Sequence, residues 1–471
     1  MTTECSQLTF DFDPLAKRDV VADFEGGTIT SDAGALLLRE LEAATTIIQR
    51  FADCFSDHRD PQLIEHSITE LVAPRVYGLA LGYEDLNDHD ELRKDPLLAT
   101  LVGKADPTGQ SRVRRRDQGT PLAGKSTLNR LELTPKDGPT KRYKKTTLDG
   151  DAVDRFFVET FVQAHTRAPE RIVLDFDATD DPLHGKQEGR FFHGYYREYC
   201  YLPLYVFCDD FLLAARLRPS DIDAAKGTVE ELERIVPQIR EQWPEVEIIV
   251  RADAGFCRDE IMAWCEENRV EYVLGLAKNE RLKGAIAEEL ESAKAEWKET
   301  EKAARIYKEF RYRTLKSWGR ERRVVGKAEH LCKGPNPRFI VTSFSEKTFE
   351  AEALYEFYCG RGDMENRIKE KQLDMFADRT STHFLWSNQI RLWLSSVAYA
   401  LLQSLRYHGL QETELAKAQC GTIRLRLLKI GAQVRLSVRR VYVSMASGYP
   451  YAKIFAPVYQ KLRALRPLPA S

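Results

Sequence analysis

Three acidic residues occupy positions from which a folded chain could bring carboxylate oxygens together. Asp177 ends the apolar run that starts at residue 172, and Asp253 follows the apolar run 248–250 in a turn. Glu365 lies in a long segment with helical character. Carboxylates that converge from separate elements are the ligands preferred by hard divalent cations, and such cations promote phosphodiester cleavage. The alternative is that each aspartate only caps the element that follows it.

The segment around Glu365 carries further polar side chains on one helical face. At about 100° per residue, Tyr358, Arg361, Glu365 and Gln372 fall within about 40° of one line down a helix expected over residues 349–371. A tyrosine and an arginine beside a carboxylate suit a surface that grips a backbone phosphate. An ordinary ion pair between Arg361 and Glu365 would give the same spacing.

The elements expected to position these residues follow an α/β pattern. Three strand-like runs, near 172–177, 201–207 and 211–217, precede an alternation of helices and strands up to residue 276. Such an order predicts a mixed sheet with helices packed on it. Helices are expected in the first hundred residues, where Pro74 interrupts one of them, and antiparallel strands over residues 304–343.

Charge is unevenly distributed along a chain whose net charge is only −2. Residues 1–103 hold 20 acidic and 8 basic side chains, whereas residues 104–145 hold 12 basic and 4 acidic ones, including Arg114, Arg115 and Arg116. No acidic residue follows Glu414, although 11 Lys and Arg do. Segregated positive charge is typical of proteins that bind a polyanion. A solvated loop and a solvated tail are the alternative.

Composition narrows the class of protein. A chain of 471 residues with 43% hydrophobic side chains is expected to form several packed domains. No apolar stretch approaches the ~20 residues that span a bilayer, the N-terminal residues lack a signal-peptide pattern, and the nine cysteines form no CxxC pair. We therefore expect a cytoplasmic protein without a membrane partner.

Three motifs resemble those of bacterial insertion-sequence transposases of the DDE class, in the subgroup with a β-strand insertion before the last acidic residue. They are Leu-Asp-Phe-Asp-Ala-Thr at 174–179, Ala-Asp-Ala-Gly-Phe at 252–256, and a segment from residue 358 that is similar to Tyr-x2-Arg-x3-Glu-x6-Lys. The resemblance implies that Asp177, Asp253 and Glu365 bind the metal. It also implies that Tyr358 and Arg361 contact DNA phosphates.

Details of the motifs leave three residues to be assigned. An Asp-x-Thr turn in the family favours Asp177, with Asp175 as the alternative. Gln372 stands where the family has lysine, and Lys369 shares the helical face of Glu365 whereas Lys371 points roughly 120° away. We therefore expect Lys369 to contact phosphate. Trp318 in the insertion is the residue expected to contact a distorted DNA end, and a small-core tryptophan is the alternative.

The resemblance implies a ribonuclease H-like mixed-sheet core with a β-rich insertion. The expected division comprises a helical DNA-binding and synapsis region at 1–150 with the basic loop 104–145, the first core part at 151–280, the insertion at 281–346, the second core part at 347–380, and a helical, basic C-terminal region at 381–471.

The activity implied is metal-dependent DNA cleavage and strand transfer at the terminal inverted repeats of an insertion sequence, with two Mg²⁺ or Mn²⁺ ions in each site. Double-stranded DNA is the expected partner, a homodimer the expected assembly, and the bacterial nucleoid the expected location when DNA is bound. A ribonuclease H-like nuclease without transposition and a catalytically silent DNA-binding protein are the alternatives.

Overall fold

The structure is a computed structural model that describes residues 9–136 and 145–466. Its contacts divide the chain into two compact units. The first unit comprises Met1–Ala52, Asp60–Leu131 and Leu401–Ser471, and the second comprises Asp53–Arg59 and Glu132–Ala400. Residues 137–144, which belong to the predicted basic loop, lie outside the described residues.

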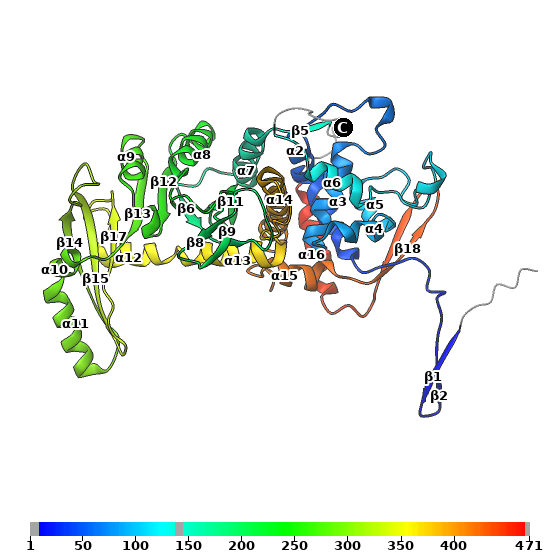
Figure 1. Ribbon diagram of the computed structural model, residues 1–471. Helices are drawn as coiled ribbons and strands as arrows, with labels where there is room; N and C mark the ends of the chain where they lie inside the picture. Colours follow the sequence, from blue (N-terminus) through cyan, green and yellow to red (C-terminus); the bar gives the residue numbers. More distant parts are fainter. Residues whose placement is uncertain (1–8, 137–144, 467–471) are drawn as a thin grey trace, which may run out of the picture. The chain divides into compact units, whose positions relative to one another are not determined.

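A nine-stranded mixed sheet forms the centre of the second unit (Figure 1). The strand order is β11-β10-β6-β12-β13-β17-β15-β14, and β16 pairs with β15. Only the pairs β6–β12 and β12–β13 are parallel, while the other strand pairs are antiparallel. The strands are β6 (Arg171–Ala178), β10 (Leu204–Cys208), β11 (Phe211–Arg216), β12 (Glu247–Ala252), β13 (Glu271–Leu276), β14 (Ala304–Tyr312), β15 (Arg322–Leu331), β16 (Gly334–Pro335) and β17 (Arg338–Thr342). The prediction of a mixed α/β fold is confirmed.

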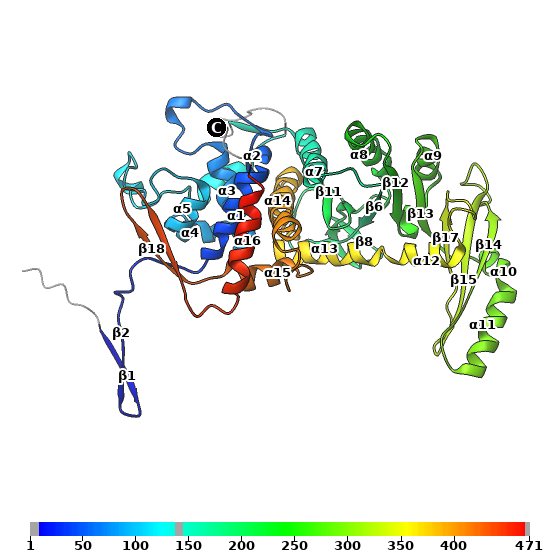
Figure 2. The same ribbon diagram turned by 180° about the vertical axis from the view of Figure 1, so that it is seen from behind.

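Helices cover this sheet on two sides. In both views of the ribbon, α7 (Gly150–Ala164), α8 (Thr228–Gln242) and α9 (Asp259–Glu267) lie along one side, and α12 (Ala351–Cys359) and α13 (Gly362–Met375) lie along the other (Figures 1 and 2). The central strands are buried on both faces: Leu174, Phe176 and Ile249 are each fully buried. Continuous apolar runs in these strands are what burial between two helical layers requires.

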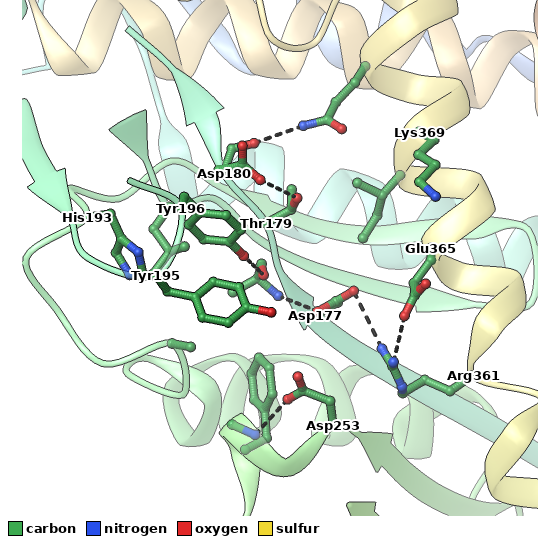
Figure 3. Close-up of a pocket in the computed structure, with 17 residues that line it drawn as sticks. Asp177, Thr179, Asp180, His193, Tyr195, Tyr196, Asp253, Arg361, Glu365 and Lys369 are labelled. Carbon is green, nitrogen blue, oxygen red and sulfur yellow. Dashed lines mark hydrogen bonds and ion pairs between the residues drawn. The ribbon is translucent and has the colours of Figure 1, made fainter. Parts of the chain in front are cut away.

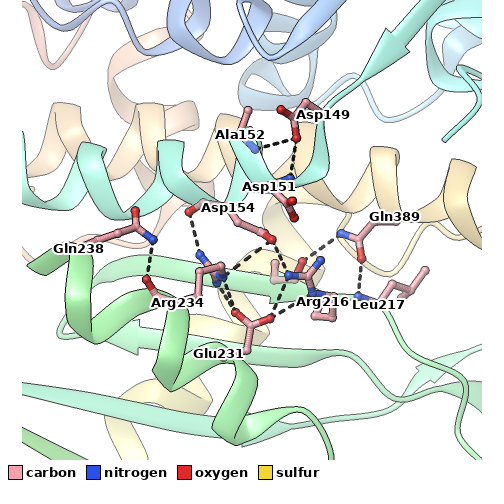
Figure 4. A network of polar contacts seen from close by, with 11 residues as sticks. Asp149, Asp151, Ala152, Asp154, Arg216, Leu217, Glu231, Arg234, Gln238 and Gln389 are labelled. Carbon is pink, nitrogen blue, oxygen red and sulfur yellow. Dashed lines mark hydrogen bonds and ion pairs between the residues drawn. The ribbon is translucent and has the colours of Figure 1, made fainter. Parts of the chain in front are cut away.

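A buried charge network attaches α7 and α8 to the edge strand β11 (Figure 4). The Arg216 guanidinium lies 2.5 Å from Asp154 and 3.0 Å from Glu231, and Arg234 pairs with Glu231 as well. Gln389 of α14 (Leu385–Gly409) accepts a hydrogen bond from the Leu217 amide, 2.6 Å away. These contacts fix the helical layer over the strands that lead to β6.

The predicted insertion continues the main sheet. Its helices α10 (Glu280–Ala285) and α11 (Ala287–Thr300) precede β14, β15 and β17. The last of these strands pairs with β13 of the central sheet, with Leu274 opposite Val341. Because backbone hydrogen bonds run across this pairing, the inserted strands form one layer with the core rather than a separate sheet.

The single helix expected over residues 349–371 was a wrong prediction, because the chain forms α12 and α13 with a break at Gly360 and Arg361. A Cβ atom at Gly360 would lie 2.7 Å from Nη1 of Arg251. Glycine therefore allows a guanidinium to approach the backbone where the two helices meet. From Gly362 to Met375 the helix is unbroken.

The first unit combines helices with two small sheets. Its helices include α1 (Leu36–Thr45), α2 (Ile47–Ala52), α3 (Ile68–Leu81), α4 (His89–Leu92), α5 (Pro96–Val102), α6 (Lys125–Glu132), α15 (Cys420–Ile423) and α16 (Ala452–Ala464). Pro74 lies inside α3 rather than ending it, because the helix starts at a Ser67–Glu70 capping box and buries every residue from Leu71 to Leu81.

Strands also occur in the C-terminal region, which the sequence predicted to be helical. β18 (Ala432–Leu436) pairs with β19 (Val441–Met445) and with β3 (Ile29–Thr30). A second hairpin, β1 (Phe10–Leu15) with β2 (Arg18–Ala22), precedes β3. Within the described ranges, no helix is both long enough and apolar enough to cross a membrane.

Candidate active site

A pocket of about 590 Å³ in the second unit brings together the three predicted carboxylates (Figure 3). Asp177, Asp253 and Glu365 all line it, although they are far apart in the sequence. The other side chains around the pocket include Thr179, Asp180, His193, Tyr195, Tyr196, Arg361, Lys369 and Gln372. The carboxylates belong to three different elements, as expected.

The parallel pairing of β6 and β12 brings Asp177 and Asp253 to one edge of the sheet. Arg251 lies opposite Asp175 in this pairing, so the residues two positions further along each strand point to the same face. Asp253 also caps the short turn Ala254–Phe256, accepting a hydrogen bond from the Gly255 amide at 2.8 Å. Both interpretations of Asp253, capping and pocket lining, therefore apply to this one residue.

Asp175 has a different environment from Asp177, two residues away. Its carboxylate accepts two hydrogen bonds from Arg251, at 2.6 and 2.7 Å, and its side chain is only 6% exposed. Arg251 also donates to the Phe357 carbonyl oxygen at the end of α12. Asp175 does not line the pocket, whereas Asp177 does. Asp177 therefore lines the pocket, whereas Asp175 forms a buried ion pair with Arg251.

Arg361 lies between two of the pocket carboxylates (Figure 3). Its guanidinium is 2.6 Å from Glu365 and 3.6 Å from Asp177. Burial raises the pKa of Asp177 to about 7, and the guanidinium opposes this shift. Burial would lower the pKa of Arg361, but its carboxylate neighbours, Asp177 above all, raise it instead. Arg361 thus supplies the positive charge that a cluster of carboxylates needs.

The donor atoms of the pocket suit a divalent cation, but the present positions of the side chains do not. The carboxylates offer only oxygen donors, which hard ions such as Mg²⁺ and Mn²⁺ prefer. In the described part of the chain, no three His, Cys, Asp or Glu side chains converge closely enough to hold a metal ion. The Arg361 guanidinium stands between Asp177 and Glu365, so this side chain must move before their oxygens can share an ion.

Tyr358 lies beside the pocket rather than in its lining. A Cβ atom at Gly275 would approach the Tyr358 hydroxyl to 2.6 Å and the Ala254 backbone nitrogen to 2.8 Å. The hydroxyl therefore packs over β13, next to the turn that carries Asp253. Burial raises the pKa of Tyr358. In this conformation the side chain supports that turn, and its expected contact with phosphate stays a prediction.

The two lysines that follow Glu365 have opposite environments. Lys369 is exposed and lines the pocket, on the side of α13 that carries Glu365 (Figure 3). Lys371 is fully buried, and its Nζ lies 4.3 Å from the centre of the Tyr205 ring. Burial lowers the pKa of Lys371 well below its usual value. Gln372, which replaces the family lysine, lines the pocket and donates a hydrogen bond to the Asp180 carbonyl oxygen.

Two other predicted contacts lie elsewhere. Trp318 is 6% exposed, with its ring edge-on to Tyr312 and 5.6 Å from the Arg322 guanidinium. These contacts place Trp318 in a small core in this structure, as the alternative interpretation expects, and its contact with a DNA end stays a prediction. The three arginines 114–116 are exposed on the first unit and do not line the pocket.

Sequence reasoning missed the aromatic side of the pocket. The pocket is lined there by His193 at the end of β8 (Phe191–His193), and by Tyr195 and Tyr196 in the turn before β9 (Glu198–Tyr201). Tyr195 is 84% exposed, and the Tyr196 ring packs edge-on against it. The density of aromatic residues between 191 and 199 was the available signal. Only the fold shows that this turn faces the carboxylates.

Comparison with known proteins identifies the family. The sequence model of the family described as "Transposase DDE domain group 1" matches residues 12–467. Among solved structures, the cryo-EM structure of the piggyBac transposase synaptic complex with hairpin DNA is similar, with 12% sequence identity and a TM-score of 0.41 over 94% of this chain and 86% of that chain. The chain matches no curated protein. Because the family match spans nearly the whole chain, this protein belongs to the transposase DDE domain group 1 family.

Proposed function

We propose that this protein binds the terminal inverted repeats of its insertion sequence, cleaves DNA there and joins the freed ends to a target. The observation that carries the proposal is the meeting of Asp177, Asp253 and Glu365 in one pocket of a family transposase. The strand order β11-β10-β6-β12-β13 supports a ribonuclease H-like core, with three antiparallel strands followed by two parallel ones.

The three carboxylates are the residues that would hold divalent ions, two Mg²⁺ or Mn²⁺ in each site. When bound, such ions activate water, or the freed 3′-hydroxyl, and stabilise the leaving oxygen of a phosphodiester. Arg361 leaves its ion pairs and meets a DNA phosphate, which satisfies its five donors with another anion. Lys369, at the mouth of the pocket, neutralises phosphate charge on the same strand.

The proposed partner is double-stranded DNA, and the proposed assembly is a homodimer, because two ends must be held together before joining. The rival activity is a nuclease that cuts DNA without joining it. The experiment uses linear DNA that carries both inverted repeats, a supercoiled target plasmid and Mg²⁺. Our proposal requires cleavage at the repeat boundary and covalent joining to the plasmid. Cleavage at random positions without joined product would instead support the nuclease.

Lys369 and Lys371 give a matched test of the phosphate contact. We expect Lys369→Ala to lower the rate of joining by roughly fivefold or more, because a charged contact is worth about 1–3 kcal/mol. Lys371→Met, which replaces a buried side chain by one of similar volume, should change this rate less than about threefold. Single-turnover joining assays measure both rates. A larger loss for Lys371→Met would contradict the assignment.

The arginine run 114–116 is proposed to bind DNA through phosphate contacts. Replacing the three arginines by glutamine should flatten the dependence of log affinity on log salt concentration by up to about 3 units, roughly one for each lost contact. Binding of labelled repeat DNA at several salt concentrations measures the slope. Lys294→Gln is the control, because Lys294 pairs with Glu291 in an acidic helix. Equal slopes for all three proteins would exclude the run from the DNA contacts.

Tyr195 is proposed to stack on a base next to the scissile phosphate. Its exposed ring lies at the mouth of the pocket, and stacking of a base on an aromatic ring contributes about 1–3 kcal/mol. Tyr195→Ala should therefore weaken binding of the cleaved end by roughly fivefold or more, while Tyr195→Phe keeps most of the affinity. Fluorescence of 2-aminopurine, placed at each position near the cleavage point, reports the stack. Identical signals from the wild type and Tyr195→Ala would rule it out.

A further inference from the structure

The hairpin formed by β1 and β2 has no partner in the described part of its own chain. Each residue of Phe10–Leu15 and of Arg18–Ala22 is exposed, and the two strands pair only with each other. A lone two-stranded hairpin is marginally stable in water, and it needs further strands or a packing surface to persist. We call residues 10–25 the arm.

One face of the arm is apolar. The strand register sets Phe10 opposite Ala22 and Phe12 opposite Val20, so these four side chains share a face. Asp11 and Val21 form a pair on the other face. Phe12 is 59% exposed, and Phe24, whose ring meets that of Phe10 edge-on, is 88% exposed. Exposed apolar groups gathered on one face mark an interaction surface.

Charge excludes nucleic acid as the partner of the arm. Residues 10–25 contain five acidic side chains, Asp11, Asp13, Asp19, Asp23 and Glu25, against Lys17 and Arg18. A net charge of −3 repels phosphate groups. The partner must therefore combine an apolar surface with basic side chains around it.

The outer half of the β18–β19 hairpin, residues 435–442, has this combination. Leu436 lies opposite Val441, each side chain is 37% exposed, and Val438 at the tip is fully exposed. Arg435, Arg439 and Arg440 are also exposed, and none of them forms an ion pair within the described residues. No acidic residue occurs in the segment. We call residues 435–442 the basic tip.

The inner half of the same hairpin is fixed to the first unit. Val434 is buried, and Val443 and Met445 pack against the cluster of Ala33, Ile430 and Ala432. The packed inner half of the hairpin therefore holds the exposed apolar tip in place, where it can bind another surface. The arm joins β3, which pairs with this base, through Gly26 and Gly27.

We propose that the arm of one copy of this chain packs its apolar face on the basic tip of a second copy. Within one chain both surfaces remain exposed, whereas a symmetric exchange covers both surfaces of each copy at once. The tip carries three arginines and no acidic residue, so its positive charge attracts the net negative charge of the arm. This proposal rests on the homodimer included in the proposed function. It assigns the arm and the basic tip as the contact that holds the two copies together in the absence of DNA.

The first test compares two adjacent valines on opposite faces of the arm. Val20→Ser removes an apolar side chain from the docking face, and Val21→Ser makes the same change on the acidic face. Sedimentation equilibrium of the full-length protein without DNA should show a wild-type dimer. We expect the dissociation constant to rise by about tenfold or more for Val20→Ser and by less than about twofold for Val21→Ser. A monomeric wild type, or equal constants for both variants, would overturn the proposal.

A charge exchange provides a second test. The arm variant Asp11→Lys/Asp13→Lys and the tip variant Arg439→Glu/Arg440→Glu should each dimerise more weakly than the wild type. Their equimolar mixture should regain dimers, because both contacts in the mixed dimer have opposite charges. A mixture as monomeric as its components would exclude the contact between chains. If a monomeric wild type cleaves DNA, the contact between arm and basic tip is refuted but the proposed cleavage activity is not. If the wild type forms dimers that do not cleave DNA, only the proposed activity is refuted.

Discussion

Replacement of Asp177, Asp253 or Glu365 by the corresponding amide will abolish DNA cleavage, while the protein still binds repeat DNA. The amides keep the size of the side chain but lose the negative charge that holds divalent ions. Such ions supply several kcal/mol of transition-state stabilisation, and each ~1.4 kcal/mol changes the rate tenfold. We therefore expect the cleavage rate to fall by at least about a thousandfold in each variant.

The readouts for this prediction separate chemistry from binding. Cleavage of end-labelled repeat DNA gives the rate, and a mobility-shift titration with the same DNA gives the affinity. Thr179→Val is the matched control, because Thr179 lines the same pocket without a charge. Wild-type cleavage by any one of the amide variants would remove that residue from the catalytic set. Chelation of divalent ions should abolish cleavage by the wild type, as each of the three amide substitutions does.

Asp175→Ala will lower the free energy of unfolding of the protein by about 3–5 kcal/mol, because it leaves the Arg251 guanidinium buried without its carboxylate. The side chains of Asp175 and Arg251 are only 6% and 11% exposed, so water screens their interaction little. Arg251 also anchors the end of α12 through Phe357. Loss of the pair therefore disturbs the junction from which α13 presents Glu365.

Urea unfolding, followed by tryptophan fluorescence, measures this effect. Asp177→Asn is the control on the same strand, and we expect its unfolding free energy to stay within about 1 kcal/mol of the wild-type value. The double variant Asp175→Leu/Arg251→Met should recover much of the loss, because it removes both charges together. A larger loss of stability for Asp177→Asn than for Asp175→Ala would reverse the roles assigned to the two aspartates.

The local sequence determined much of the core. Apolar runs with β-branched residues predicted β6, β12 and β13, and the acidic residues at or near their ends predicted where two functional carboxylates belong. The motifs at 174–179, 252–256 and from 358 predicted the family, which the match over residues 12–467 confirms. These features depend on neighbouring residues and on regular periodicity, so they can be read along the chain.

Only the tertiary structure decided which residues share an environment. The pairing of Asp175 with Arg251 depends on the register of two strands whose residues lie 76 positions apart. The burial of Lys371 over Tyr205, and of Trp318 against Tyr312, depends likewise on partners from other elements. Hydropathy along a helix or strand specifies which face turns inward, but the identity of the partner is set by long-range packing.

The same distinction explains the two features of the pocket that the sequence did not predict. The helix break at Gly360 lies where Arg251 of β12 approaches the backbone, and no periodicity encodes that approach. The aromatic turn at Tyr195 lies near the carboxylates because the chain passes from β9 to β10, in which Tyr205 pairs with Asp177 of β6. Local propensity therefore determined the elements and their acidic ends, whereas distant contacts decided which aspartate pairs with Arg251 and which lines the pocket beside Arg361.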